Sequence, residues 1–510
     1  MNSWQSSIRA FSHPRVITML FFGFSAGVPL LLIFSSLGLW LREAGVDRST
    51  ATLFSWAALG YSFKFVWAPL ADCLPIPYLT RLLGKRRSWI LLSQLAIMSS
   101  IILMSLSDPS SGTTQLKFMA LAAVLLGFSS ATQDIVIDAY RIESASSELQ
   151  ALMASTYVAG YRLGMIAAGA GSLFIASYFG SEMGSYSYSA WQKTYIIMSL
   201  IMLAGVITTF VISEPDHCLA KERKYKNETY IRLLLVFIFS VTSFVLLFHL
   251  SSDIAASCKN YLSDLFKNHV LGSFIVETIR LAIGVITALT VSFFCIKLKI
   301  IEEKVIFESY AEPIIDFFKR HGFNLALILL VLIGLYRISD IVLGVIANIF
   351  YQDLGYSKNE IASIVKTFGL IMTIIGGFLG GILAMRFGVM KILFIGALLT
   401  VVTNLLFMLL AINGYNIPLL YLVISADNLS AGIASAAFIA FLSRLTNVSF
   451  TAMQYALFSS LMTLIPKTLG GYSGSIVDNI GYTQFFFVAS MLGIPILGII
   501  WLANKHLKIE

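Results

Sequence analysis

Continuous apolar segments, each about 20 residues long, recur along almost the whole chain of 510 residues. A segment of this length, wound as an α-helix, spans the hydrocarbon core of a bilayer. Transmembrane β-strands need only about 10 residues of alternating polarity, so the pattern excludes a β-barrel. A hydropathy window of about 19 residues predicts about fourteen helices, at residues 16–40, 50–70, 88–107, 117–138, 150–178, 192–212, 230–250, 271–297, 323–350, 360–385, 389–412, 417–443, 451–470 and 482–503. The sequence therefore predicts an all-α polytopic membrane protein.

The composition excludes the soluble alternatives. Only 12% of the residues are charged and 57% are hydrophobic, whereas soluble domains carry about 25% charged residues. Such a chain cannot coat a water-facing surface, which excludes a soluble enzyme and a disordered protein. The cysteines are widely spaced and form no C-x-x-C motif, which argues against a disulfide scaffold or a zinc site; they are Cys73, Cys218, Cys258 and Cys295.

Positive charges are distributed unevenly between the loops. If the N-terminus lies in the cytoplasm, the cytoplasmic segments hold most of the Lys and Arg residues outside the helices, among them Arg81, Lys85, Arg86 and Arg87. This asymmetry is the positive-inside pattern. It predicts that both termini are cytoplasmic, and it accounts for the formal charge of +8 without a nucleic-acid partner.

Two parts of the chain resemble each other. The segment 131–141 aligns with 434–444, and further matches follow in the same order at nearly the same offset. Parallel six-helix repeats are typical of the major facilitator fold, in which the substrate site lies between the two halves near the membrane midplane. The predicted division is an N-terminal six-helix half, a central insertion with two extra helices and a C-terminal six-helix half, at residues 1–214, 215–322 and 323–510.

A charged pattern follows the predicted second helix. Asp72 precedes a basic run at residues 85–87, whereas the second half has Met385 at the position of the acid. An acid at a helix end that faces cations across a loop can hold one side of a transporter closed. The alternative is that the basic residues only anchor the loop at the inner membrane face. The predicted gating residues are Asp72, Arg86, Arg87 and Arg141.

Ionisable residues inside the predicted helices indicate where the chain functions, because a charge in hydrocarbon is costly and faces a partner or a cavity. The basic ones are Lys64, Arg162, Arg337, Lys366 and Lys467, and the acidic ones are Asp134, Asp138, Asp340 and Asp427. The excess of cations over anions favours an anionic solute.

Three of the acids are candidates for proton coupling. Asp134 is the main one, because it lies deep in its helix, has no cation near it in sequence, and burial favours the protonated form of a carboxyl group. Asp138 and Asp340 are further candidates. For these two the alternative is a plain ion pair, of Asp138 with Arg141 and of Asp340 with Arg337.

Aromatic residues make up 13% of the chain. Four tyrosines next to charged candidates are suited to stack on sugar faces, although helix packing is the simpler explanation for each; these are Tyr61, Tyr140, Tyr161 and Tyr336. Three tryptophans lie where an interfacial aromatic belt is expected: Trp40, Trp191 and Trp501.

Eight segments carry a more specific signal. They are KFVWAPLAD at 64–72, GKRRSW at 84–89, ATQDIVID at 131–138, GYRLGM at 160–165, LYRISD at 335–340, VKTFGL at 365–370, NLSAG at 428–432 and TAMQYAL at 451–457. With these motifs the chain resembles the AmpG family of muropeptide permeases, a family of the major facilitator superfamily.

The resemblance implies a proton-driven importer of N-acetylglucosaminyl-1,6-anhydro-N-acetylmuramyl peptides across the Gram-negative inner membrane. Such importers serve peptidoglycan recycling, and some influence β-lactamase induction. A monomer is expected, with the solute, protons and the bilayer as its partners and with no cofactor or metal. The expected substrate contacts are Lys64, Tyr61, Gln133, Tyr161, Arg162, Arg337 and Lys366.

Two features depart from the family. Other members can carry the extra helix pair after the second half, and they have Lys where this chain has Arg337. An importer of acetyl-coenzyme A or of another anionic solute is the alternative function. A membrane-embedded enzyme is the least favoured alternative, because the six histidines are scattered over loops and helix ends.

Overall fold

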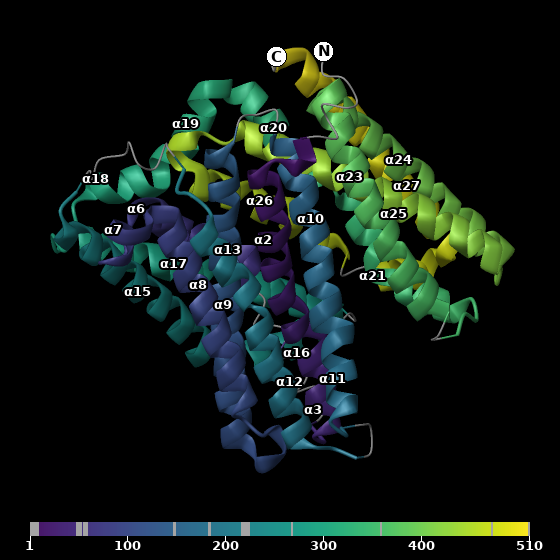
Figure 1. Cartoon of the computed structure of the whole chain (residues 1–510), viewed down its shortest axis with the longest axis horizontal. Helices are drawn as coiled ribbons and strands as arrows, with labels where there is room; N and C mark the ends of the chain where they lie inside the picture. The colour runs from purple at the N-terminus through teal and green to yellow at the C-terminus, as the bar shows by residue number, and fades with distance from the viewer. Residues whose placement is uncertain are drawn as a thin grey trace. The chain divides into compact units, whose positions relative to one another are not determined.

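The computed structural model describes residues 10–46, 54, 60–145, 149–181, 185–215, 225–266, 269–357, 360–470 and 473–507. The chain divides into two compact units, one made of Met1–Ala220 and Phe317–Glu510, the other of Lys221–Asp316. The predicted insertion, 215–322, contains the second unit. Both units are built from helices (Figure 1).

Membrane-spanning helices dominate both units. Within the described residues, thirteen helices are long and apolar enough to cross a bilayer. Two of them, Glu228–Phe248 and Ile275–Lys297, belong to the second unit. The predicted helix at 50–70 lies largely outside the described residues. The predicted class, an all-α polytopic membrane protein, is confirmed.

Within its described residues, the first half supplies eleven α-helices to the first unit. They are α2 (Pro14–Leu31), α3 (Leu37–Glu43), α5 (Gly60–Phe63), α6 (Ala68–Cys73), α7 (Leu79–Leu83), α8 (Lys85–Ser105), α9 (Thr113–Ser144), α10 (Gln150–Ile166), α11 (Ser172–Tyr178), α12 (Tyr188–Ile201) and α13 (Leu203–Val211). A wide turn at Leu32–Ser36 joins α2 to α3. Pro29 precedes this turn, and because its nitrogen donates no hydrogen bond, the regular helix is weakened there.

The second half supplies the remaining segments of the first unit. They are α20 (Phe323–Leu335), α21 (Ile338–Asp353), η8 (Ile361–Phe368), α23 (Gly369–Phe387), α24 (Val389–Asn413), α25 (Ile417–Leu445), α26 (Thr451–Gly470) and α27 (Ser473–His506), preceded by α19 (Glu312–His321). Arg337 lies at the break between α20 and α21. Broken helices occur inside membranes where the backbone lines protein or a cavity.

Glycines let pairs of helices approach until their backbones touch. A Cβ added to Gly23 of α2 would lie 2.1 Å from the carbonyl oxygen of Tyr157 in α10, and one added to Gly160 of α10 would lie 1.9 Å from that of Leu20. Each of these glycines is followed by another four residues later, which is the small-xxx-small pattern of close helix pairs in membranes. In the second half, Gly432 allows the same approach between α23 and α25.

Two of the three tryptophans expected in an interfacial belt are buried instead. Trp40 and Trp191 have no exposed surface, and their rings stack with centroids 5.6 Å apart. Each indole N–H has a partner inside the protein, Tyr186 for Trp40 and Glu43 for Trp191. The expectation that these two rings face the membrane interface is therefore wrong. Trp501 is 59% exposed.

The second unit is a pair of long helices with a third helix between them in sequence. Its helices are α15 (Asn227–Leu250), α16 (Ser252–Phe266), α17 (His269–Lys297) and the short α18 (Glu303–Ile306). Lys259 of α16 pairs with Glu277 of α17 at 2.5 Å, and Glu277 also pairs with Arg280 at 3.3 Å. Arg280 lies over the ring of Phe248 in α15. This network joins the three long helices and accounts for the charge of Arg280 inside a predicted span.

Candidate functional site

The two halves of the first unit are joined by polar contacts at the end where α2 begins and α27 ends (Figure 1). Asp72, near the end of α6, accepts hydrogen bonds from the backbone N–H groups of Ala452 and Met453, at 3.2 and 2.9 Å. These N–H groups lie at the N-terminus of α26, where a helix has unpaired donors and a partial positive charge. An acid of the first half thus caps a helix of the second half.

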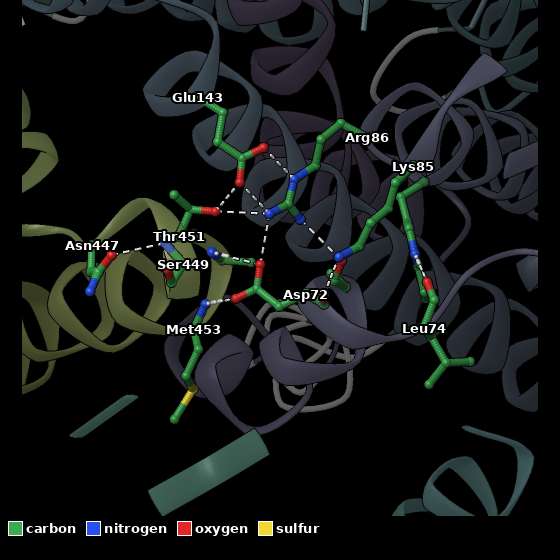
Figure 2. Close-up of polar contacts among 12 residues, drawn as sticks. Asp72, Leu74, Lys85, Arg86, Glu143, Asn447, Ser449, Thr451 and Met453 are labelled. Atoms are coloured by element: carbon green, nitrogen blue, oxygen red, sulfur yellow. Dashed lines mark hydrogen bonds and ion pairs between the residues drawn. The ribbon is translucent and has the colours of Figure 1, made fainter. Parts of the chain in front are cut away.

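Arg86, the second residue of α8, connects this cap to a second acid. Its Nη2 lies 2.7 Å from Asp72 and 2.6 Å from Glu143, and it donates to the Thr451 hydroxyl at 2.8 Å. The Thr451 hydroxyl in turn donates to Glu143. Figure 2 shows these four side chains converging on one point between α6, α8, α9 and α26. We refer to Asp72, Arg86, Glu143 and Thr451 as the lock.

Arg87 contacts its own half rather than the lock. Its guanidinium donates to the carbonyl oxygens of Thr209 and Phe210 at the end of α13. Glu214, just after α13, accepts the backbone N–H groups of Arg86 and Arg87, and so caps α8. Burial raises the pKa of Glu214, and the two N–H donors oppose that shift. These contacts hold the first turn of α8, which carries Arg86.

Arg141 is a second buried cation that joins the halves. It lies on α9 with no exposed surface, donates to the Ser443 hydroxyl of α25 at 2.7 Å, and packs over the ring of Tyr455 in α26. Its Nη2 also pairs with Asp138 at 3.1 Å. The simple ion pair considered for Asp138 therefore exists, and the same guanidinium bridges the two halves.

Lys64 lies beside the acids of α9. Its ammonium is 3.9 Å from Asp138, and it interacts electrostatically with Asp134. Asp134 has no cation near it in sequence, but Lys64 reaches it in space because the turn Lys64–Val66 packs against α9. The Tyr157 hydroxyl donates to Asp134 at 3.4 Å. Two cations and two acids thus form one buried network, with Arg141 as its other cation.

Two guanidinium groups from opposite halves lie close enough for their charges to repel. Arg162 of α10 interacts unfavourably with Arg337 of the second half. Arg337 pairs with Asp340 at 3.5 Å. Arg162 contacts the sulfur of Met165 at 3.9 Å, and it has no acidic partner among the described residues. One positive charge at this place is therefore uncompensated.

The other predicted substrate contacts in the first half are polar groups around α9 and α10. The hydroxyl of Tyr61 shares a hydrogen bond with Ser130. Gln133 has no exposed surface and accepts a 3.4 Å hydrogen bond from Ser25. Tyr161 directly precedes Arg162 and is partly exposed.

Three further candidates are an exposed lysine and two tyrosines whose hydroxyls donate to backbone carbonyls. Lys366 is exposed in η8. The hydroxyls of Tyr140 and Tyr336 donate to the backbone carbonyls of Ser213 and Leu393, each within its own half. The side chain of Lys467 lies outside the described residues.

Four residues of this region were missed by sequence reasoning: Glu143, Ser443, Thr451 and Tyr455. Glu143 follows Arg141 by two residues at the same helix end, so its charge was a usable signal. The other three are uncharged and come from the second half. No local pattern connects them to α8 or α9. Within the described part of the chain, no group of three or more His, Cys, Asp or Glu side chains could hold a metal ion.

Known proteins resemble this chain over almost its whole length. The sequence model of the Major Facilitator Superfamily matches residues 15–336 and 328–508. A Rickettsia conorii protein that carries the name AmpG 4 is 30% identical over 501 residues, which cover 98% of this chain and 99% of that protein. The anhydromuropeptide permease of Escherichia coli K12 is 27% identical over 502 residues, which cover 98% of this chain and 82% of the permease.

Solved structures agree on the fold. The proton:xylose symporter XylE has a TM-score of 0.60 at 12% identity and covers 98% of this chain and 96% of its own. The human organic anion transporter MFSD10 has a TM-score of 0.56 at 14% identity and covers 95% of this chain and 99% of its own. At such identities the likeness concerns the fold alone.

Proposed function

The chain belongs to the major facilitator superfamily and, within it, to the AmpG family, and from this premise we propose that it is a proton-coupled importer of anhydromuropeptides in the bacterial inner membrane. It is a multi-pass membrane protein of a transporter family. The proposed substrates are N-acetylglucosaminyl-1,6-anhydro-N-acetylmuramyl peptides. Their peptide stems bear free carboxylates, which guanidinium ions bind through two parallel hydrogen bonds.

The observation that carries the proposal is the cation pair Arg162 and Arg337. The two charges repel each other across the boundary between the halves, and only Arg337 has an acidic partner among the described residues. A carboxylate bound between them would remove the repulsion and accept hydrogen bonds from both planar forks. Because one cation comes from each half, such a ligand would be bound between the two halves. Alternating access requires the substrate site to lie there.

We place the end that carries the lock in the cytoplasm. The positive-inside pattern supports this, since Arg81, Lys85, Arg86 and Arg87 gather there. On this orientation the lock closes the cytoplasmic side, and the substrate would enter from the periplasm. Rocking of one half against the other would then break the lock and open the site to the cytoplasm.

We propose Asp134 as the principal proton-linked group of the first half. Asp138 is held by two cations, Lys64 and Arg141, whereas Asp134 interacts with Lys64 and the hydroxyl of Tyr157. Protonation of Asp134 would remove its attraction for Lys64, and the ion pair between Lys64 and Asp138 would become stronger. A proton could therefore be taken up at Asp134 without removing the partner of Arg141.

Uptake into liposomes tests the substrate assignment. The labelled disaccharide tripeptide should accumulate when the outside is acidic, and acetyl-coenzyme A should not; the reverse result would favour the alternative solute.

Arg162→Ala should raise KM for the tripeptide substrate roughly tenfold or more, because hydrogen bonds to charged groups are worth about 1.5–3 kcal/mol. A substrate whose stem carboxylates are amidated should be affected far less.

Arg280→Ala is the matched control. Arg280 is also an arginine within a membrane span, but its described partners all lie in the second unit. Its loss should leave KM for both substrates unchanged. Equal losses for the charged and the amidated substrate in Arg162→Ala would mean that Arg162 does not bind the stem.

A further inference from the structure

Asp427 is an acid of α25 to which the proposed transport cycle assigns no role. Its Oδ1 accepts a 3.4 Å hydrogen bond from the Thr403 hydroxyl of α24. The side chain is partly exposed, and no cation pairs with it among the described residues. The carboxylate of Asp340, from α21, lies close enough to repel that of Asp427.

The surroundings of Asp427 contain one cation for two acids. Asp340 pairs with Arg337 at 3.5 Å and also interacts with Thr400. With both carboxylates ionised, Arg337, Asp340 and Asp427 carry a net charge of about −1, which balances the positive charge of Arg162 next to Arg337. A proton bound by either acid removes this balance and leaves one net positive charge.

The other titratable groups around the two acids do not change this balance of charge. The phenols of Tyr336 and Tyr351 lie near Asp340 and Asp427, respectively, and both are buried. Lys366 is carried by η8, which packs against α25, but in the described part of the chain it makes no ion pair with Asp427. The protonation of the two acids therefore sets the net charge beside Arg162 and Arg337.

The network in the first half differs in this respect. Lys64 and Arg141 balance Asp134 and Asp138 when all four are ionised. That network is balanced by cations of its own half. The two acids of the second half are balanced only when Arg162 of the first half is counted with Arg337.

We propose that Asp340 and Asp427 form a second proton-binding site, whose proton raises the affinity of the neighbouring cation pair for an anionic substrate. With both acids ionised, the charges of Arg162 and Arg337 are cancelled by those of Asp340 and Asp427. A proton taken from the periplasm and bound by the acid pair leaves one net positive charge, which a substrate carboxylate neutralises. Proton and anion then favour each other's binding by the same factor, as linkage requires, and both are released on the cytoplasmic side.

This inference rests on the proposed function, because it needs an anionic substrate at Arg162 and Arg337. It adds a second linked proton, bound in the second half, to the one proposed at Asp134. The proton is exchanged only with water, so the step involves no other reactant. The ion pair with Asp340 holds the side chain of Arg337 in position. Protonation of Asp427 changes the net charge of the two arginines and the two acids.

Equilibrium binding tests the proposal without transport. The affinity of the purified full-length protein for the disaccharide tripeptide would be measured between pH 5.5 and 8. The wild-type affinity should fall as the pH rises, by at most about tenfold per pH unit for one linked proton. Asp427→Asn, which resembles the protonated acid, should keep the low-pH affinity over the whole range.

Two further variants complete the experiment. Thr403→Val removes the hydrogen bond that favours the ionised carboxylate, so the fall in affinity should move to higher pH. Asp353→Asn alters an exposed acid at the other end of α21, bonded to Tyr482, and should behave as wild type. A shifted profile in Thr403→Val supports the proposal even if Asp427→Asn does not fold.

The outcomes separate this proposal from the proposed function. A wild-type pH slope that persists in Asp427→Asn, or an unshifted profile in Thr403→Val, would overturn the proton site while leaving substrate binding intact. Failure of the wild-type protein to bind the tripeptide at any pH would instead overturn the proposed function. A pH slope abolished by Asp134→Asn and kept by Asp427→Asn would assign the coupling to the first half.

Discussion

At the scale of single residues, burial decides which charges matter. An exposed ion pair contributes about 0–1 kcal/mol, whereas removing one member of a buried pair costs about 3–5 kcal/mol because its partner is left uncompensated. Arg86 and Arg141 are almost or fully buried. Arg87, by contrast, caps a helix of its own half and reaches the surface. We therefore expect Arg86 and Arg141 to control the contact between the halves and Arg87 to affect local stability.

Asp134→Asn is the residue-scale prediction for coupling in the first half. The amide keeps the shape of the protonated acid and cannot release a proton. Accumulation driven by a pH gradient should be abolished in liposomes, while binding and exchange of labelled for unlabelled substrate persist. Asp264→Asn, in the exposed part of α16, is the control and should accumulate substrate normally. Undiminished accumulation in Asp134→Asn would leave the acids of the second half as the carriers.

At the scale of helices, the packing in each half depends on glycines rather than on large apolar side chains. Lipid tails are as apolar as Leu, so helices in a membrane associate through close van der Waals contact and interhelical hydrogen bonds. Gly23 and Gly160 bring α2 and α10 into backbone contact. The second unit is joined differently, through the ion pairs of Lys259, Glu277 and Arg280.

Gly160→Ala should destabilise the protein. The added methyl group would stand 1.9 Å from the carbonyl oxygen of Leu20, so α2 and α10 must separate. Overpacking of this kind costs about 1–3 kcal/mol, which thermal unfolding in detergent would register as a lower Tm. Gly498→Ala in α27 is the control, because nothing lies within 4 Å of its Cβ position. An equal Tm in the two variants would contradict close contact of α2 with α10.

Labelling of Cys258 tests the topology of the second unit. Cys258 is exposed on α16 next to Lys259, between the two spans of this unit. We expect it on the periplasmic side, because α15 and α17 each cross the membrane. As the only cysteine left in the chain, it should react with an impermeant maleimide added outside intact cells. A cysteine at position 81 should react only after the membrane is opened. Reaction of both from the same side would remove the extra pair from the membrane.

At the scale of the whole first unit, the lock and the bridge from Arg141 to Ser443 are polar contacts that join the two halves at one end. Gly381 packs closely against Ser155 across the same boundary. In such an arrangement, a few buried polar groups stabilise the closed state. It predicts that a single substitution can change which side of the transporter is open.

Asp72→Asn should open the side that carries the lock. The amide loses the ion pair with Arg86 and weakens the cap of α26, and loss of a buried charge pair shifts an equilibrium by about 100-fold or more. A cysteine at the buried position of Ser155 should then react faster with a maleimide supplied from the cytoplasm. Arg87→Ala should leave this rate unchanged, because the guanidinium of Arg87 donates to carbonyl oxygens at the end of α13, in its own half. Slower labelling in Asp72→Asn would contradict the lock.

The sequence by itself determined the class of the protein and the position of nearly every membrane span. Hydropathy is a local property, since about 20 consecutive residues must all be apolar to cross a bilayer. The sequence also located Asp72 and Arg86, because an acid followed by a basic run is visible in one loop. The spans, together with the AmpG motifs, were therefore readable without coordinates.

Only the tertiary structure decided which charges are partners. Arg86 meets Glu143 across 57 residues, and Arg141 meets Ser443 across 302. Partners so far apart in sequence produce no periodic pattern. Which side chains meet depends on how two helices pack and on how each is rotated about its axis. The same reason explains the tryptophans: hydropathy places Trp40 near a helix end, but whether its ring faces lipid or protein depends on the neighbouring helix, and here that helix carries Trp191.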